Sequence, residues 1–181
     1  MTAPLSAGAL AEALARALPA GWRMRDRADS DLPALSQLYA STRWAELQAV
    51  DWPDEQKLAF LADQFGKQHS HYLQHYPGAL WLVMELEGAV AGRIYLHPSE
   101  RDIRLMDVAL VPQLRRQGVG TKLLQALAAE ADATGRTISL HVEPYNPAAD
   151  LYRRLGYADV ETRGYYLFME RAPGGVPTAA S

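Results

Sequence analysis

The chain has 181 residues, a formal net charge of −3 and 49% hydrophobic residues, which fits one compact domain with a sizeable core. It contains no cysteine, so disulfides, cysteine-based zinc sites and an acyl-cysteine intermediate are excluded. The slight negative charge argues against a dedicated nucleic-acid binder, and no stretch is long and apolar enough to span a bilayer. We expect a soluble, cytoplasmic protein.

Residues 1–20 are expected to form a helical extension of the domain. Leu10, Leu14 and Leu18 recur at every fourth position, which places them on one face of a short helix. A secretory signal is not expected, because residues 1–6 carry no basic side chain and charged residues interrupt the apolar run that follows. We expect this helix to dock on the body of the protein or on a neighbouring subunit, with a mobile extension as the alternative.

Residues 21–171 carry alternating signals for strands and helices and are expected to form one domain. Short runs bounded by turn residues predict strands over residues 22–26, 80–87, 90–97, 103–111, 137–142, 157–162 and 165–170. Segments with an apolar stripe predict helices that begin near Ser30 or Asp31, near Pro53, at Val119 and at Pro147. The tail, residues 172–181, is rich in proline, glycine and alanine and is expected to be disordered.

The order of these elements predicts the fold class. Strands that lead into helices at Gly118 and Asn146 imply locally parallel pairs, whereas the two short connections at residues 87–89 and 163–164 imply antiparallel hairpins. We therefore expect an α/β fold with a central mixed β-sheet of about seven strands and helices on both of its faces.

A glycine-containing loop, Arg115-Arg116-Gln117-Gly118-Val119-Gly120-Thr121, connects strand 103–111 to a long helix. The first turn of a helix presents unpaired backbone N–H groups at the positive end of the helix dipole, which makes an anion cradle suited to a pyrophosphate. Side chains of Arg115, Arg116 and Lys122 would add positive charge. The alternatives are a simple tight turn for the glycines and a solvated helix start for the basic residues.

A second motif spans residues 146–157. Asn146 precedes a short helix that carries Leu151-Tyr152 and ends at Gly156-Tyr157. This motif and the spacing Arg115-x-x-Gly118-x-Gly120 resemble the two signatures of the GNAT superfamily of acyl-CoA-dependent N-acetyltransferases, and they stand in the order that the family has. The strand order is also similar to the GNAT fold along nearly the whole of residues 22–171.

The resemblance implies that acetyl-CoA is the cosubstrate and that no metal takes part. It implies a bulge that splays strand 103–111 from strand 137–142, with the pantetheine arm paired to main chain in that gap. An amide of Leu110 or Val108 would then face the acetyl oxygen. The residues implied to bind the cofactor are Val108, Ala109, Leu110, Arg115, Arg116, Gln117, Gly118, Val119, Gly120, Thr121 and Asn146.

Tyr152 is the predicted general acid, because a tyrosine hydroxyl is protonated at neutral pH and can donate to a departing thiolate. The alternative for Tyr152 is a core tyrosine on a short helix. The predicted transfer is direct, through a ternary complex.

The general base is less defined. Some family members carry a carboxylate early in the strand before the loop, at a position that is Arg104 here. The candidates are Glu143, which follows the strand forming the gap and is preferred, His141, Asp107 and water. Asp107 is alternatively a structural acid that pairs with Arg93 or Arg104.

The resemblance places the acceptor between the segment that joins the first two helices of the domain and the final hairpin. A small-molecule or amino-acid-like amine is the expected acceptor, and a protein N-terminus or lysine is the alternative. A non-catalytic CoA-binding regulatory module is the alternative outside the enzymes, and a homodimer is possible. The residues that would line the pocket are Tyr39, Arg43, Trp44, Asp51, Trp52, Arg163, Tyr165 and Tyr166. The alternative is that these aromatic residues only pack at the edge of the sheet.

Three histidines lie close together at positions 69, 71 and 75, with His71 and His75 one helical turn apart. Since no convincing third ligand accompanies that pair, we expect a polar or half-buried helix face, and no metal site.

Overall fold

The computed structural model of the chain describes residues 5–175, and the seven predicted strands are confirmed. The strands are β1 (Trp22–Asp26), β2 (Leu80–Leu86), β3 (Ala89–Pro98), β4 (Asp102–Leu110), β5 (Thr137–Val142), β6 (Ala158–Arg163) and β7 (Tyr166–Arg171). The α-helices are α1 (Ala7–Ala17), α2 (Leu32–Arg43), α3 (Asp54–His75), α4 (Val119–Thr134) and α5 (Ala148–Arg154). Short 3-10 turns cover Asp29–Asp31, Trp44–Leu47 and Pro112–Leu114.

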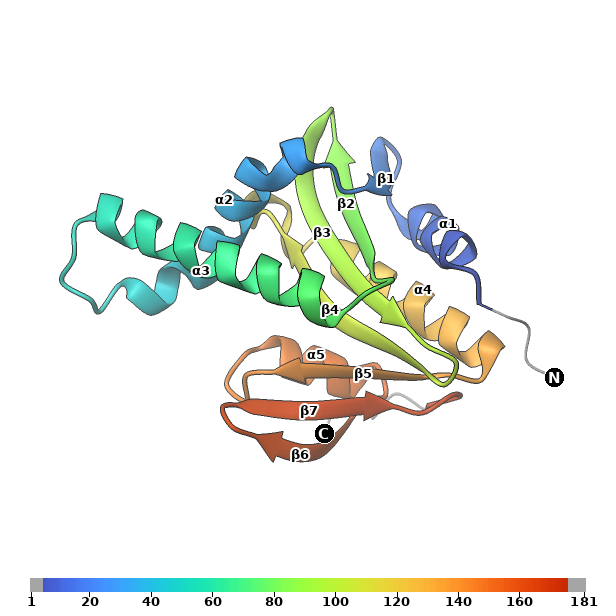
Figure 1. Cartoon of the computed structure of the whole chain (residues 1–181). Helices are drawn as coiled ribbons and strands as arrows, with labels where there is room; N and C mark the ends of the chain where they lie inside the picture. Colours follow the sequence, from blue (N-terminus) through green and yellow to red (C-terminus); the bar gives the residue numbers. More distant parts are fainter. Residues whose placement is uncertain (1–4, 176–181) are drawn as a thin grey trace.

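The strands form one mixed sheet in the order β1-β2-β3-β4-β5-β7-β6. Only the central pair, β4 and β5, is parallel, and the other neighbours are antiparallel. β4 pairs with β5 over just three residues, Asp102, Ile103 and Arg104. Beyond them the sheet divides into two arms, β1–β4 and β5–β7–β6, which diverge from the end where β4 and β5 meet (Figure 1).

Helices cover both faces of the sheet, as the α/β fold class predicts. On one face α1, α4 and α5 pack on alternate side chains of the strands, and Leu10, Leu14 and Leu123 are completely buried there. On the other face α2 and α3 enclose a smaller cluster built around Leu35 and Phe65. The N-terminal extension therefore docks on the body of its own chain, beside α4 (Figure 1).

The described C-terminal end of the chain is held by polar contacts. The Asp132 carboxylate on α4 accepts hydrogen bonds from the Arg171 guanidinium at 2.6 and 3.0 Å and from the Gly174 amide at 2.7 Å. Residues 172–175 thus form a turn against α4. The other residues of the predicted disordered tail, 176–181, and the first four residues of the predicted extension lie outside the described residues.

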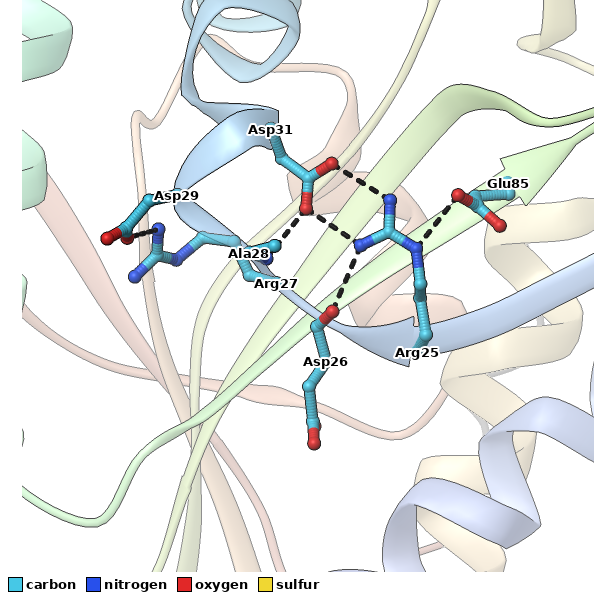
Figure 2. Close-up of polar contacts among 7 residues, drawn as sticks. All are labelled: Arg25, Asp26, Arg27, Ala28, Asp29, Asp31 and Glu85. Atoms are coloured by element: carbon cyan, nitrogen blue, oxygen red, sulfur yellow. Dashed lines mark hydrogen bonds and ion pairs between the residues drawn. The ribbon is translucent and has the colours of Figure 1, made fainter.

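The beginning of α2 is fixed to the sheet by an ionic network (Figure 2). Arg25 of β1 donates two hydrogen bonds to the Asp31 carboxylate, at 2.7 and 2.8 Å, and one to Glu85 of β2 at 2.8 Å. Asp31 was a predicted helix cap, but its carboxylate accepts from the Ala28 amide and from Arg25 instead of from α2. The Arg25 hydrogen bonds lower the pKa of Asp31 to about 2, so this carboxylate stays ionised.

Candidate functional site

A β-bulge bends β4 where it leaves β5. Tyr95 of β3 lies opposite Asp107, but the next residue, Leu96, lies opposite Leu105, so Met106 is the inserted residue. A bulge bends the strand that contains it. The predicted bulge and the predicted splay of β4 from β5 are therefore both present.

The hydrogen-bonding phase of β4 decides which of its amides face the gap between the arms. Val111 donates to the Ala91 carbonyl of β3 at 2.9 Å, and facing residues in an antiparallel ladder alternate between bonded and non-bonded pairs. Val108 and Leu110 therefore direct their N–H groups away from β3, toward the gap. Ala109, included in the predicted pantetheine-pairing segment, directs its amide toward β3 instead.

The loop before α4 forms the predicted cradle of backbone amides. Arg116 and Gly118 adopt left-handed conformations, with φ of 60° and 83°, which turn the chain sharply into the helix. Lys122 donates to Gly118, and the amides of residues 116–121 have no backbone acceptor among the described residues. Gly120 has open space where a Cβ would lie, so an anion can approach these amides and the positive end of the α4 dipole.

Arg115 has a different role from the one predicted for its charge. Its Nε donates to the Leu110 carbonyl at 2.9 Å and its Nη2 donates to the Ser41 hydroxyl at 3.0 Å. The side chain thereby connects the loop to the open edge of β4 and to α2. Arg115, Arg116 and Lys122 are all exposed.

α5 brings the second motif to the gap. Asn146 accepts a hydrogen bond from the Ala148 amide at 2.9 Å, which fixes the start of the helix. One turn later Tyr152 is 7% exposed and its ring packs on Tyr157. Burial raises the pKa of the Tyr152 hydroxyl, and the charges of Asp107 and Glu143 raise it further. The hydroxyl is therefore protonated at neutral pH.

Glu143, the preferred base candidate, is held in an ion pair. Arg43 of α2 donates to Glu143 Oε1 at 2.7 Å and to Glu46 at 3.0 Å, and Asn146 donates to Glu143 Oε2 at 3.4 Å. Burial alone would raise the pKa of Glu143, but the hydrogen bonds and the charge of Arg43 outweigh it, so the pKa is lowered. A carboxylate with a lowered pKa is a weaker proton acceptor.

The two other base candidates are also partnered. Asp107 pairs with Arg93 of β3, which is 2% exposed. His141 of β5 contacts the guanidinium of Arg104 through Nδ1. Sequence reasoning included Arg93 as a possible partner of Asp107 but missed Gln68, which also accepts a hydrogen bond from Arg93. The available signal was a single arginine in the apolar strand β3, since a buried arginine needs polar partners.

The residues predicted to line the acceptor pocket differ in their surroundings. Trp52 packs on Phe60 at 5.7 Å between ring centroids, and Arg163 lies over the Phe168 ring at 3.9 Å. Tyr165, at the tip of the β6–β7 hairpin, is 90% exposed. Two hollows of about 530 and 320 Å³ lie elsewhere, the first along α3 and the second beside β1 and β2. Of the predicted pocket residues, Trp52, Tyr165 and Tyr166 are thus exposed to solvent.

The histidines of α3 do not converge. His71 stacks on His75 with centroids 4.1 Å apart, whereas His69 packs against Phe65 and Trp81. Within residues 5–175 no group of three or more potential metal ligands occurs. No helix in the same range is both long and apolar enough to cross a membrane.

Comparison with known proteins agrees with this geometry. A family model described as "Acetyltransferase (GNAT) family" matches residues 41–157. N-alpha-acetyltransferase 50 of Danio rerio is 33% identical over 93 residues, which are 49% of this chain and 55% of that protein. A putative [ribosomal protein bS18]-alanine N-acetyltransferase of Bacillus subtilis (strain 168) is 34% identical over 90 residues, 48% of this chain and 58% of that protein. The chain thus spans little more than half the length of these curated relatives.

Two solved structures share the fold. The PaiA N-acetyltransferase of Thermoplasma acidophilum, in complex with coenzyme A, superposes with a TM-score of 0.62 at 19% identity and covers 83% of this chain and 98% of that one. The ribosomal-protein-S18-alanine N-acetyltransferase of Escherichia coli gives 0.58 at 21% identity and covers 88% and 96%. At these identities the likeness concerns the fold alone.

Proposed function

The chain belongs to the acetyltransferase (GNAT) family, and from that premise we propose that it moves the acetyl group of acetyl-CoA directly to a primary amine. The observation that carries the proposal is the open edge of β4 beside the uncapped start of α4. The amides of Val108 and Leu110 on β4 and those of residues 116–121 at the start of α4 form two groups of donors without a backbone acceptor among the described residues.

Each of the two groups of donors suits a different part of acetyl-CoA. The amides at the start of α4 suit the pyrophosphate, which carries negative charge and multiple acceptor oxygens. The open edge of β4 suits the amide groups of the pantetheine arm, which can add to a sheet edge as a strand does. The structural neighbour from Thermoplasma acidophilum was solved with coenzyme A, which supports the assignment.

The chemistry then follows from the groups around the gap. The amine nitrogen attacks the thioester carbon, so that a C–N bond forms and the C–S bond breaks. The amide of Val108 or Leu110 stabilises the negative charge that develops on the acetyl oxygen. Tyr152, kept protonated by its buried position, donates its proton to the departing thiolate. The chain has no cysteine, which supports direct transfer without an acyl-cysteine.

We propose that Glu143 holds the site together and does not act as the base. Because its two oxygens bind Arg43 and Asn146 and its pKa is lowered, it connects α2 to the start of α5 as a charged group. Proton removal from the amine is then the task of another carboxylate or of water.

A small-molecule or amino-acid-like amine is the first acceptor that we propose. The N-terminal amine of a polypeptide is the second, and two observations favour it. The relatives from Danio rerio and Bacillus subtilis are named for N-alpha and ribosomal-protein alanine acetylation. The β6–β7 hairpin, on the expected acceptor side, exposes Tyr165 and Tyr166. A cytoplasmic location and a homodimer stay predictions.

The test is release of the CoA thiol from acetyl-CoA in the presence of an amine panel. The panel contains diamines, free amino acids and short peptides, with each peptide matched by the same peptide blocked at its N-terminus. We expect thiol release that depends on a free amine, together with the N-acetylated product by mass spectrometry. Coenzyme A binding without turnover on any acceptor would instead indicate a non-catalytic CoA-binding module.

A further inference from the structure

Asp107 is a second carboxylate at the gap, on the opposite arm of the sheet from Glu143. We propose that Asp107 is the group that binds and deprotonates the acceptor amine, and that Arg93 is its positioning residue. The inference rests on the acetyl transfer proposed above and assigns a residue to the amine half of that reaction.

The position of Asp107 follows from the bulge. It comes directly after Met106, the inserted residue, at the point where β4 has left β5. Because side chains alternate along a strand, Asp107 shares a face with Ala109, which packs in the cluster under α2 and α3. This is the acceptor side, whereas the neighbouring amide of Val108 points into the gap. The charge of Asp107 also raises the pKa of the Tyr152 hydroxyl.

A buried scaffold holds the Asp107 carboxylate in place. Arg93 Nη2 donates to Asp107 Oδ2 and, at 2.9 Å, to the Gln68 side chain. The Arg93 guanidinium lies near the Phe65 ring at 5.7 Å and over the Tyr95 ring at 4.8 Å, which restricts its movement.

The backbone next to Asp107 is held as well. Tyr72 of α3 donates its hydroxyl hydrogen to the Met106 carbonyl at 3.3 Å. The side chain and the preceding peptide of Asp107 are therefore both fixed from the α3 face, which is the preorganisation that an acceptor-binding group needs.

The two carboxylates at the gap differ in how many of their oxygens accept side-chain hydrogen bonds. Asp107 forms side-chain hydrogen bonds through Oδ2 alone among the described residues, and its side chain is 18% exposed. Glu143 uses Oε1 for Arg43 and Oε2 for Asn146. Asp107 Oδ1 is thus the carboxylate oxygen that can accept an N–H from an incoming amine without breaking an ion pair.

The proton balance of the step is complete. The amine donates an N–H to Asp107 Oδ1 while its lone pair attacks the acetyl carbon. The nitrogen proton passes to Asp107 and then to solvent as the C–N bond forms. The C–S bond breaks with its electron pair on sulfur, which takes the proton of Tyr152, and solvent returns a proton to that tyrosine.

Four variants test the proposal in the full chain, with an amine that the wild-type protein acetylates. D107N removes the charge, and D107E keeps a charged partner for Arg93 while it moves the oxygen. R93K keeps the positive charge but loses the planar fork. The matched control is D102N, on the same strand, where the carboxylate accepts hydrogen bonds from the Thr137 and Ser139 hydroxyls at 2.7 Å each.

We expect D107N to lower kcat about 100-fold, because it removes the base, and we expect D107N and D107E to raise the KM for the amine about 10- to 100-fold, the range for loss of a hydrogen bond to a charged group. The KM for acetyl-CoA and the affinity for coenzyme A should stay within about twofold of wild type. R93K should raise the amine KM by a smaller factor, again without effect on acetyl-CoA. D102N should change neither KM.

A wild-type amine KM and kcat in D107E, with coenzyme A binding intact, would overturn the proposal. So would an equal loss toward amine and acetyl-CoA in the Asp107 variants, because that pattern indicates a structural role only. If D107N does not fold, D107E decides the question alone. A wild-type protein that releases no thiol with any amine would refute the proposed function itself, which separates the two failures.

Discussion

The two sides of the proposed site are built from different chemical groups. The cofactor side consists of backbone amides on β4 and at the start of α4. The acceptor side consists of side-chain pairs, Arg43 with Glu143 and Arg93 with Asp107. Substitutions other than proline leave a backbone amide in place, so the cofactor side is damaged mainly by added atoms. On the acceptor side and at the catalytic groups, a substitution that removes side-chain atoms should impair the function of that side chain alone.

The largest effect should come from an added side chain at Gly120. Glutamate there has open space and suits the helix dipole, so the fold should keep its stability. Its charge would stand among the amides proposed for the pyrophosphate. We expect the dissociation constant for coenzyme A to rise by about 100-fold or more, measured by calorimetry.

Gly66 on α3 provides the matched control for G120E, because it also has open space at the position of a Cβ and lies in a helix. G66E should leave coenzyme A affinity unchanged. Equal affinities in G120E and wild type would show that the phosphates bind elsewhere.

The second prediction concerns Y152F, which removes only the hydroxyl oxygen of Tyr152. Y152F should lower kcat by about 100-fold, the usual contribution of a general acid, while coenzyme A affinity stays the same. Steady-state kinetics and calorimetry measure the two quantities. Y157F is the control, since Tyr157 is a buried tyrosine that packs on Tyr152. A kcat for Y152F equal to that of the control would remove Tyr152 from the mechanism.

The smallest effect should come from Asp31, far along α2 from the gap. Its pKa is lowered to about 2 in the folded protein, from a usual value of 3.8, so the ionised group stabilises the fold above about pH 4. This stability is lost as the pH falls toward 2.

D31N should therefore lower the free energy of unfolding by about 1 kcal/mol near pH 6. Urea unfolding should show that the difference from wild type shrinks as the pH approaches about 2. Coenzyme A affinity should not change near pH 6. A difference that grows at low pH would contradict the role given to the Arg25 pair.

The cofactor side was predictable because backbone cradles require specific residues at short spacing. Gly118 takes a φ of 83° at the start of α4, and Asn146 and Tyr152 lie on one short motif. On the acceptor side the Arg43–Glu143 pair was not predictable, because these residues are 100 positions apart and no local pattern joins them, whereas the Asp107–Arg93 pair was one of the predicted alternatives. The same limit explains why Glu143 was preferred as the base before its ion pair was known.

The ends of strands are also set partly by contacts that a local sequence pattern does not show. Residues 137–142 were predicted with the ends that β5 has, since a glycine-bounded helix precedes them. β6 was predicted from Tyr157 but begins at Ala158. The Tyr157 amide donates to the Tyr152 carbonyl at 3.0 Å and so closes α5. A contact with the preceding helix thus outweighs the β-propensity of the tyrosine.

The central claim is that backbone amides of β4 and of the α4 start bind coenzyme A. Amide chemical shifts of the isotope-labelled protein, followed during titration with coenzyme A, test it most directly. We predict that the largest changes occur at Val108, Leu110 and residues 116–121, with smaller ones at Ala109. Changes confined to other regions, such as the hollow along α3, would contradict the account.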